Sequence, residues 1–472
     1  MKPSKTDNSQ DNLFQSRLSN QLNPRHEMMI LAKMVPWDDL SKEFVDCYCP
    51  NDGKGGCPPK PVRLMIGLLL LQHMHSLSDE LVVDRWVENP YWQYFCGYDL
   101  LQWRMPIDPS SLTRFRNRIG DERMEKILSL TINIAVQTKF VEKKDLKKVI
   151  VDTTVMPKNI EYPTDSKLCE KARVRIVKLC QKHNIPLRQN YNQVCKKLIR
   201  RLGGYLHAKQ MKRAKKEIKA LKTILGRVIR DTERKIHNNK DLEAIFKPTL
   251  DLATRLLAQE TKDKNKIYSL HEPKVVCISK GKSRNRYEFG SKVSLVMTHK
   301  KSLITSSQSL DNNPYDGHTL KAALTNAQEV TKTKIDTAFV DKGYKGHGIV
   351  QDEGQDDKNE IKVFISGQKK RNGQKLTKTI KKQLKRRQAI EPIIGHMKND
   401  GKLDLCRLKG VIGDKINAVL AACGHNLRMI LKHLRKLLRN PYFVSFFGAF
   451  LMQMIMFYRI FGARSSILTV RI

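Results

Sequence analysis

The sequence predicts an α/β protein: a mixed sheet flanked by helices, interrupted by a helical insertion, and preceded by an all-helical N-terminal domain. Short runs rich in β-branched residues lie on both sides of a long stretch with helical apolar spacing. Before the first such run, helical patterns alternate with Pro and Gly breakers. Mixed strands followed by packed helices indicate an α/β core.

The N-terminal part is expected to comprise a flexible polar tail, residues 1–26, and a helical domain, residues 27–140. Residues 58–77, PPKPVRLMIGLLLLQHMHSL, predict a buried helix after a proline-rich entry. The helical pattern of residues 77–95 begins with Ser78, a candidate N-cap.

Residues 107–130 predict a short helix, a turn at Gly120 and a second helix, an arrangement similar to a helix-turn-helix. The cations of the first helix, Arg114, Arg116 and Arg118, are candidate phosphate contacts. An ordinary solvated helix face explains them equally well.

Residues 141–437 are expected to form a second domain. Val149 to Val151 form a β-branched run that predicts a core strand ending in Asp152. Residues about 166–265 have helical spacing and many cations, which predicts a helical insertion, for example a long antiparallel hairpin. For any single lysine there, a charged solvent face is favoured over a DNA track. Further strands are predicted within 274–280, 287–300, 302–310, 335–346 and 361–367, and helices within 313–330 and 376–437.

An apolar tail, residues 438–472, ends the chain. Its run 442–458, YFVSFFGAFLMQMIMFY, is at the lower length limit for a membrane span. A membrane span is made less favourable by three small or polar residues within this run, Ser445, Gly448 and Gln453. A buried or partner-binding helix is favoured, with a membrane segment as the alternative.

The charge balance points to a polyanionic partner. Lys and Arg number 88 against 47 Asp and Glu, giving a formal net charge of +41 and a sequence pI near 9.9. Nucleic acid is favoured because clustered cations release counterions from phosphates. An anionic membrane surface and a ribosomal or chromatin-packaging role are the alternatives, although packaging proteins need no acidic triad.

The ten cysteines are scattered, and the polar N-terminus carries no apolar signal segment. These features predict free thiols in a reducing cytoplasm. Cys47, Cys49 and Cys57 have a spacing that could suggest zinc, followed by His73 and His75. A fourth ligand at the usual spacing is missing, so ordinary cysteines are favoured.

Three acids are candidates for metal-dependent phosphoryl transfer. Two Mg²⁺ ions about 4 Å apart can activate a nucleophile and stabilise charge on a phosphate. A few carboxylates from different elements can hold them. Asp152 and Asp341 each follow a predicted strand, and Glu391 lies on a predicted helix. Taken singly, each acid has a structural alternative: a turn or cap residue for the aspartates, and an ion pair with Arg387 for Glu391.

Helical geometry places Arg387, Glu391 and Lys398 within roughly 40° of one another around the helix axis. An acid that binds metal would then lie between two cations that meet phosphate. Pro392 requires the helix to kink or to begin nearby, so this face is approximate across Glu391.

Several motifs in this order resemble bacterial insertion-sequence transposases of the insertion-sequence-five type. The resemblance covers roughly residues 27–160 and 285–437. It rests on RLMIGLLLLQHMHSLSDELVVDRWVENPYWQYFCGY and PIDPSSLTRFRNRIG in the first range. In the second part of the chain it rests on DTTV, NPYDGHTL, DKGYKGH, RRQAIEPIIGHMKNDGKLDLCRLKG and GDKINAVLAACGHNLR.

The resemblance implies an RNase H-like core with a DDE triad of Asp152, Asp341 and Glu391 as catalytic residues and metal ligands. It implies two Mg²⁺ ions, with Mn²⁺ as a substitute, and binding to the terminal inverted repeats of the element. Related transposases carry Y-x2-R-x3-E-x6-K, and here Leu384 stands at the tyrosine position. A role that needs an aromatic ring or hydroxyl there is therefore not expected.

The expected function is Mg²⁺-dependent cleavage and strand transfer of double-stranded DNA, at element ends and target, by a homo-oligomer associated with the cytoplasmic nucleoid. Candidate phosphate-binding residues are Arg387, Lys398, Lys342, Arg114, Arg116 and Arg118. His347 is a further candidate near the site. The alternatives are a nuclease without strand transfer, an inactive DNA-binding relic, and a membrane-associated basic protein.

Overall fold

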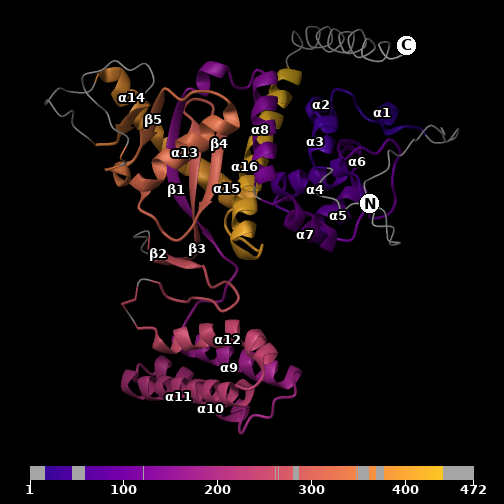
Figure 1. The fold of residues 1–472 in the computed structure, drawn as a ribbon. Helices are drawn as coiled ribbons and strands as arrows, with labels where there is room; N and C mark the ends of the chain where they lie inside the picture. Colours follow the sequence, from indigo (N-terminus) through magenta and orange to yellow (C-terminus); the bar gives the residue numbers. More distant parts are fainter. Residues whose placement is uncertain are drawn as a thin grey trace, which may run out of the picture.

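The computed structural model describes most of the chain, and all structural statements concern that part. The described residues are 16–44, 59–120, 122–260, 262–263, 265–279, 286–346, 348, 361–367 and 377–439. Figure 1 shows helices α1–α8 beside one end of a sheet and a separate helical bundle, α9–α12, beyond the lower end of that sheet. The sheet with its covering helices lies between these two helical parts.

Eight helices build the N-terminal part, and its first helix lies inside the segment that was expected to be a flexible tail. Their bounds are α1 Leu18–Gln21, α2 Glu27–Met34, α3 Trp37–Phe44, α4 Val62–Met74, α5 Asp79–Glu88, α6 Pro90–Phe95, α7 Ser110–Ile119 and α8 Glu122–Gln137. Leu18 is fully buried and its amide donates to the Asp99 carbonyl. Ser78 caps α5 as predicted, its Oγ accepting from the Leu81 amide at 3.1 Å.

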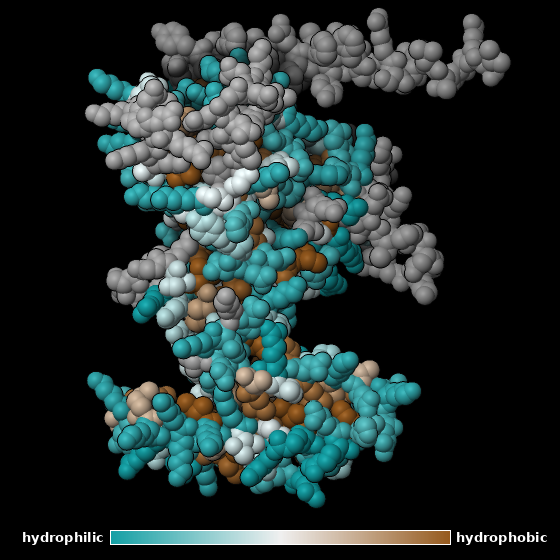
Figure 2. Space-filling view, turned by 60° about the vertical axis from the view of Figure 1, so that its left-hand side comes forward, coloured by the Kyte–Doolittle hydropathy of each residue, from teal (hydrophilic) through white to brown (hydrophobic). Residues whose placement is uncertain are grey.

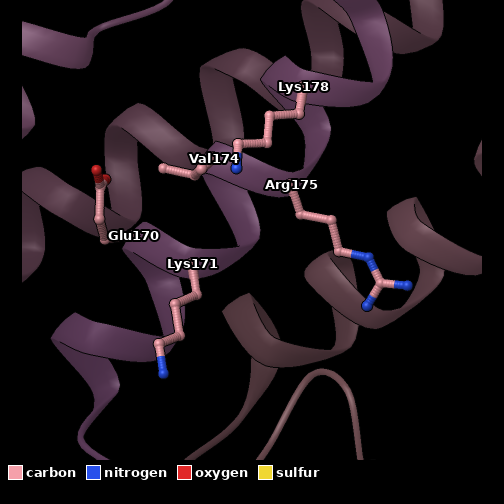
Figure 3. Close-up of a pocket in the computed structure, with 5 residues that line it drawn as sticks. All are labelled: Glu170, Lys171, Val174, Arg175 and Lys178. Carbon is pink, nitrogen blue, oxygen red and sulfur yellow. The ribbon is translucent and has the colours of Figure 1, made fainter. Parts of the chain in front are cut away.

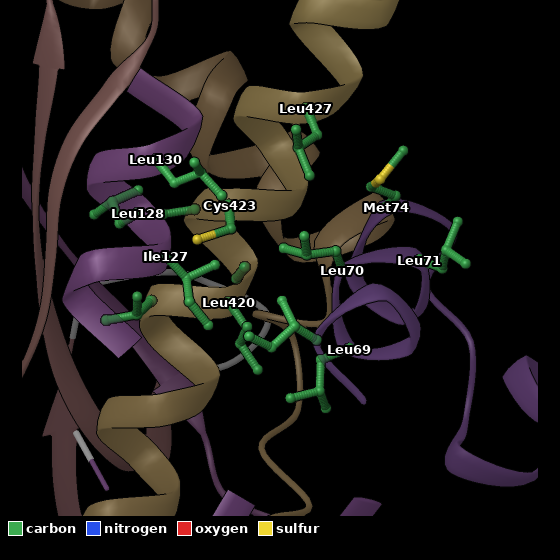
Figure 4. Close-up of a cluster of buried hydrophobic side chains, with 14 of the residues drawn as sticks. Leu69, Leu70, Leu71, Met74, Ile127, Leu128, Leu130, Leu420, Cys423 and Leu427 are labelled. Atoms are coloured by element: carbon green, nitrogen blue, oxygen red, sulfur yellow. The ribbon is translucent and has the colours of Figure 1, made fainter. Parts of the chain in front are cut away.

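Helix α4 is buried on nearly all sides because it packs between the N-terminal helices and the long C-terminal helix α16, Gly410–Leu438. Figure 4 shows α16 between α4 and α8, with Leu69 and Leu70 of α4 on one side and Ile127 and Leu128 of α8 on the other. Helices α4 and α16 approach closely, since a Cβ at Gly424 would lie 2.5 Å from the His73 carbonyl oxygen. One continuous apolar core therefore joins the N-terminal helices to the sheet's helical cover.

The sheet has the strand order β2-β3-β1-β5-β6, with β4 also paired to β3. The strands are β1 Lys148–Pro157, β2 Val276–Ser279, β3 Tyr287–Thr298, β4 Ile304–Leu310, β5 Thr337–Val340 and β6 Lys362–Ile365. β3 runs antiparallel to β1, β2 and β4, whereas β5 and β6 run parallel to β1. An antiparallel meander followed by parallel strands on the other side of β1 is the RNase H-like arrangement, so the predicted fold class is confirmed.

Strand β1 is longer than the sequence predicts, and Asp152 lies within it rather than at its end. β1 continues to Pro157 because its antiparallel partner β3 pairs with it over the whole length. The parallel partner β5 ends at Val340 and pairs with β1 only up to Ile150. Asp152 thus lies in the part of β1 that no longer pairs with β5, which leaves its side chain half-buried.

Four helices form the insertion between β1 and β2, in place of the hairpin considered from the sequence. They are α9 Asp165–Lys182, α10 Asn192–His207, α11 Met211–Ile236 and α12 Lys240–Ala258. They pack around their own apolar clusters, one centred on α9, α11 and α12 and one between α10 and α11. A separate core explains why the insertion interrupts the sheet in sequence without disturbing strand pairing.

The remaining helices cover the sheet on its two faces. They are α13 Asp316–Thr331, α14 Lys378–Arg386, α15 Ile390–Gly401 and α16, with short 3₁₀ turns η3 Lys342–Tyr344 and η4 Arg387–Ala389. α13 packs on an apolar cluster with Val149, Val151 and Val340, whereas α15 and α16 belong to the larger core on the other face.

Within the described residues, none of the helices is long and apolar enough to cross a membrane. The apolar run 442–458, Cys47, Cys49, Cys57 and His347 lie outside the described residues. The predictions that concern them therefore stay predictions.

Candidate active site

The first acid lies on β1, and the second directly follows β5, the strand that pairs in parallel with β1. Lys148 pairs with Thr337, Val149 with Ala338 and Ile150 with Phe339. The same register, continued by two residues, sets Asp152 opposite Asp341. Neighbouring strands are about 4.8 Å apart, and equivalent residues in register project on the same face. This extension of the register places the two carboxylates toward the same edge of the sheet.

Asp341 also shapes the turn that follows its strand. It is the N-cap of η3, and its Oδ1 accepts from the Gly343 amide at 2.7 Å. A Cβ at Gly343 would lie 3.0 Å from Asp341 Oδ1 and 3.3 Å from Asp316 Oδ2. Glycine is therefore needed where two carboxylates approach the backbone, and Asp316 enters the site as a fourth acid.

Arg387 links Glu391 to this site, because its guanidinium lies near both Glu391 and Asp152. Helix α15 begins at Ile390, so Pro392 falls in its first turn, where a missing amide costs least. The Arg387 guanidinium lies 3.9 Å from Asp152 Oδ2 and 4.0 Å from Glu391 Oε1. Arg387 is 13% exposed against 65% for Glu391. Glu391 is thus the solvent-facing member of the group, and Arg387 forms an ion pair with it while also lying next to Asp152.

Tyr344 lies among the aspartates and is fully buried. Burial, together with the negative charges of Asp152, Asp316 and Asp341, holds the pKa of its phenol far above the ordinary value. Its hydroxyl has no hydrogen-bond partner among the described residues. A buried polar group without a hydrogen-bond partner costs stability. Its presence among carboxylates therefore indicates a functional site.

A polar network that the sequence did not reveal fixes Asp316. Its Oδ1 accepts from Thr153 Oγ1 at 2.9 Å and lies 2.6 Å from the Nζ of Lys292. Lys292 is 9% exposed and also donates to the Pro314 carbonyl at 2.8 Å. The available signal was the NPYDGHTL motif, which places an acid at the start of a helix. Strand spacing alone could not show that this helix begins beside Asp341.

The donor set suits a hard divalent cation. Its oxygens come from Asp152, Asp341, Asp316 and Glu391, with no sulfur or imidazole among the ligands described here, and Mg²⁺ prefers such oxygens. Among the described residues, however, no three Asp, Glu, His or Cys side chains already surround one point. The acids are instead spaced around Tyr344 and Arg387. Unshielded carboxylates repel one another, so closer approach requires a cation.

The predicted phosphate contacts do not all lie together. Lys342 is exposed beside Asp341, and Lys398 is half-buried on α15, the helix of Glu391. Arg114 and Arg118 are exposed on α7, outside this cluster of acids.

Arg116 does not suit the role that was predicted for it. It is buried and forms an ion pair with Asp79, with a second hydrogen bond of 3.1 Å to the same carboxylate. The apolar stripe of α7, which includes Leu112 and Phe115, turns Arg116 inward while Arg114 and Arg118 face solvent. Its role is to join α7 to the start of α5.

The histidine of the predicted zinc alternative is a core residue. His73 is fully buried, and its Nδ1 lies 3.1 Å from the Leu69 carbonyl oxygen. Burial lowers the pKa of this imidazole to about 3. His75 stacks on Trp92 with ring centroids 4.8 Å apart. Packing in the core therefore accounts for His73, whereas the exposed His75 is held by its stacking on Trp92.

Comparison with known proteins identifies two parts of the chain. Residues 16–118 match the family described as Transposase domain (DUF772), and residues 253–427 match the family described as Transposase DDE domain. The chain belongs to the insertion-sequence DDE transposases. The family implies an activity that cuts or joins DNA strands and depends on divalent metal ions.

The transposase is also similar to an uncharacterised protein, ORF8 in the nfe locus of Rhizobium meliloti. The two are 43% identical over 210 residues, which is 44% of this chain and 100% of the relative. No solved structure matches the chain. The match to the DDE domain includes Asp341 and Glu391 but begins after Asp152. Strand pairing places Asp152 in the same sheet, because β1 lies between β3 and β5.

Proposed function

We propose that this transposase cuts double-stranded DNA at the ends of its element and joins the freed 3′ ends to target DNA, with Asp152, Asp341 and Glu391 as its catalytic acids. The observation that supports this proposal is that Arg387 lies within 4.0 Å of both Asp152 and Glu391, while the strand that precedes Asp341 pairs in parallel with β1. The insertion-sequence-five type stays a prediction.

These three acids would hold two Mg²⁺ ions, with Mn²⁺ as a substitute. Such ions, when bound, lower the pKa of the attacking water or 3′-hydroxyl and offset charge on the phosphate. Arg387 and Lys398 flank Glu391 and would orient the phosphate, with Lys342 beside Asp341.

DNA binding and catalysis are assigned to different parts of the chain. We assign binding of the element's inverted repeats to residues 27–140, where Arg114 and Arg118 are exposed, and catalysis to residues 141–437. The reaction brings two ends together, so a homo-oligomer is expected in the active complex. The bacterial nucleoid is the expected place of action.

The decisive experiment incubates the full chain with labelled duplexes that carry the DNA flanking its coding region, with and without Mg²⁺. We expect nicks at the element ends, followed by joints to a second duplex. Pre-cleaved ends separate the alternatives: a nuclease nicks but forms no joints, and an inactive relic binds the duplex without nicking. Either outcome would replace the proposed reaction.

Arg387 gives a prediction in which the apparent affinity for Mg²⁺ rises while the maximal rate of cleavage falls. The substitution Arg387→Gln removes a cation 3.9 Å from Asp152. The Mg²⁺ concentration at half-maximal cleavage should fall, because the acids no longer share their charge with the guanidinium. The maximal rate should fall by about a hundredfold, because a phosphate contact is lost. Lys385→Gln, an exposed change on α14, is the matched control. An unchanged Mg²⁺ dependence would show that Arg387 does not act on the metal site.

A further inference from the structure

The helical insertion carries a concentration of positive charge that the active site does not use. Residues 165–258 contain 25 Lys and Arg against 8 Asp and Glu. Figure 1 places this bundle beyond the end of the sheet, with α10 and α11 on its lower side, away from the sheet. Figure 2 shows hydrophilic side chains along that lower side. The question is whether these charges form an ordinary solvated surface or a binding site.

The exposed cations of helix α11 are spaced so that they lie along one face of the helix, which indicates a binding site. We define the α11 stripe as Lys212, Lys216, Lys219, Arg227, Arg230 and Arg234, all of which are exposed. At about 100° per residue, these six positions fall within an arc of roughly 80°. The exposed Thr223 fills the one gap in the series. The stripe faces directly away from the buried side of the helix, which includes Leu221, Leu225 and Val228.

No carboxylate of α11, a helix described throughout, lies within this arc. Glu217 and Asp231 are buried at the edges of the packed face, and Glu233 projects to one side of the stripe. Of the six cations, Arg234 is 3.6 Å from Asp231, and the others form no ion pair within the described residues. Like charges three and four residues apart destabilise a helix. The stripe therefore does not serve the helix's own stability, and a polyanion would offset its repulsion.

The C-terminal half of the stripe borders a hollow suited to phosphate oxygens. Arg227, Arg230 and Arg234, together with Arg188 from the α9–α10 loop, line a space of about 220 Å³. Asp231 also lies in this space, where it accepts from the Arg188 amide at 2.9 Å. Asp231 thus fixes the loop that brings Arg188 to the three α11 arginines.

A second basic surface, on α9, lacks these properties. Figure 3 shows Lys171, Arg175 and Lys178 around a hollow that also contains Glu170. Lys171 is 2.6 Å from Glu161, and Arg175 donates to the Leu270 carbonyl at 2.9 Å. Lys171 and Arg175 therefore hold the insertion to its connecting segments, which is a structural role.

We propose that the α11 stripe binds the phosphate backbone of double-stranded DNA that extends from the active site. The stripe runs over the 23 residues 212–234, a rise of 22 steps, and is therefore about 33 Å long, close to one turn of B-form DNA. A straight row of Lys and Arg along one face of a helix fits contacts to successive phosphates, which position the duplex without reading its sequence. This inference rests on the proposed function, because it assumes that DNA is the substrate.

The test compares two variants of the full chain with the same change of charge. The stripe variant converts Lys212, Lys216, Lys219, Arg227, Arg230 and Arg234 to Gln. The control variant converts Lys178, Lys182, Lys196, Arg200, Lys240 and Lys247, which are exposed elsewhere on the insertion. Affinity for a 60-base-pair duplex of arbitrary sequence is measured from about 50 to 200 mM salt.

Each lost phosphate contact lowers the slope of log affinity against log salt by about 0.9. We expect the slope to fall by about 3 to 5 for the stripe variant and by less than about 1 for the control. Thermal unfolding should show no loss of stability in the stripe variant, because like-charge repulsion is relieved. Equal slopes in the two variants would overturn the proposal, as would stronger retention on anionic lipid vesicles than on DNA. Mg²⁺-dependent nicking, measured separately, distinguishes this failure from failure of the proposed function.

Discussion

The Asp341→Asn variant should lose DNA cleavage by about a thousandfold or more while still binding element ends. The change keeps the size of the side chain and the Oδ1 that accepts from Gly343, so the η3 turn should persist. It removes one negative charge from the edge shared with Asp152, where divalent cations would bind. DNA affinity should stay equal or rise slightly, because a charge that repels phosphate is removed.

The matched control is Asp336→Asn, which removes an acid just before the same strand. Asp336 is half exposed and 3.7 Å from Lys147 in a surface ion pair, so little effect on activity or stability is expected. Cleavage is measured with labelled element ends, binding by gel shift, and folding by thermal unfolding. Normal cleavage by Asp341→Asn would remove Asp341 from the site, and equal loss in both variants would indicate a folding effect.

The fold class was predicted correctly because local periodicity in the sequence indicates where strands and helices lie. The β-branched run before Asp152 and the strand before Asp341 are both present in the sheet. Their parallel pairing could be expected from the crossover between them, but their register could not, since it is set by contacts between distant residues. The true length of β1 was missed for the same reason, because β3 supports it from outside the local pattern.

The site was predicted in part, and the missing part depends on tertiary contacts. Asp316 and Tyr344 carry no local pattern that distinguishes them from a helix cap and a core aromatic residue. Their importance follows only from the approach of the start of α13 to Asp341. Arg116 was, by contrast, assigned a role in the site that its position in the structure contradicts. A basic helix face predicted a phosphate contact, whereas Asp79 from another helix holds that guanidinium in the interior.

Lys158 should contribute strongly to the stability of the fold. It is 3% exposed, and its Nζ lies 2.6 Å from Asp414 and 3.5 Å from Glu272. Glu272 in turn accepts from the Gly410 amide at 3.0 Å. This cluster joins the end of β1, the segment returning from the insertion, and the start of α16. Lys158→Met would leave two carboxylates buried without their cation, which should cost about 3–5 kcal/mol of unfolding free energy.

The control for this prediction is Lys147→Met, which breaks a half-exposed pair and should cost less than about 1 kcal/mol. Denaturant unfolding at neutral pH measures both variants. Adding Asp414→Asn and Glu272→Gln to Lys158→Met should recover much of the loss, because the unpaired charges are removed. A triple variant as unstable as Lys158→Met would indicate that packing, rather than charge, explains the effect.

The same cluster predicts a pH dependence whose sign is fixed. Burial raises the pKa of Asp414 above its ordinary value, and Lys158 opposes this shift. A carboxyl with a raised pKa in the folded state binds its proton more tightly there, so stability falls as pH rises from the unfolded pKa through the folded one. Removing Lys158 should raise the folded pKa further and widen this window. The deficit of Lys158→Met should therefore be smaller at pH 5 than at pH 7.5, and a deficit that grows on acidification would contradict the charge-based account.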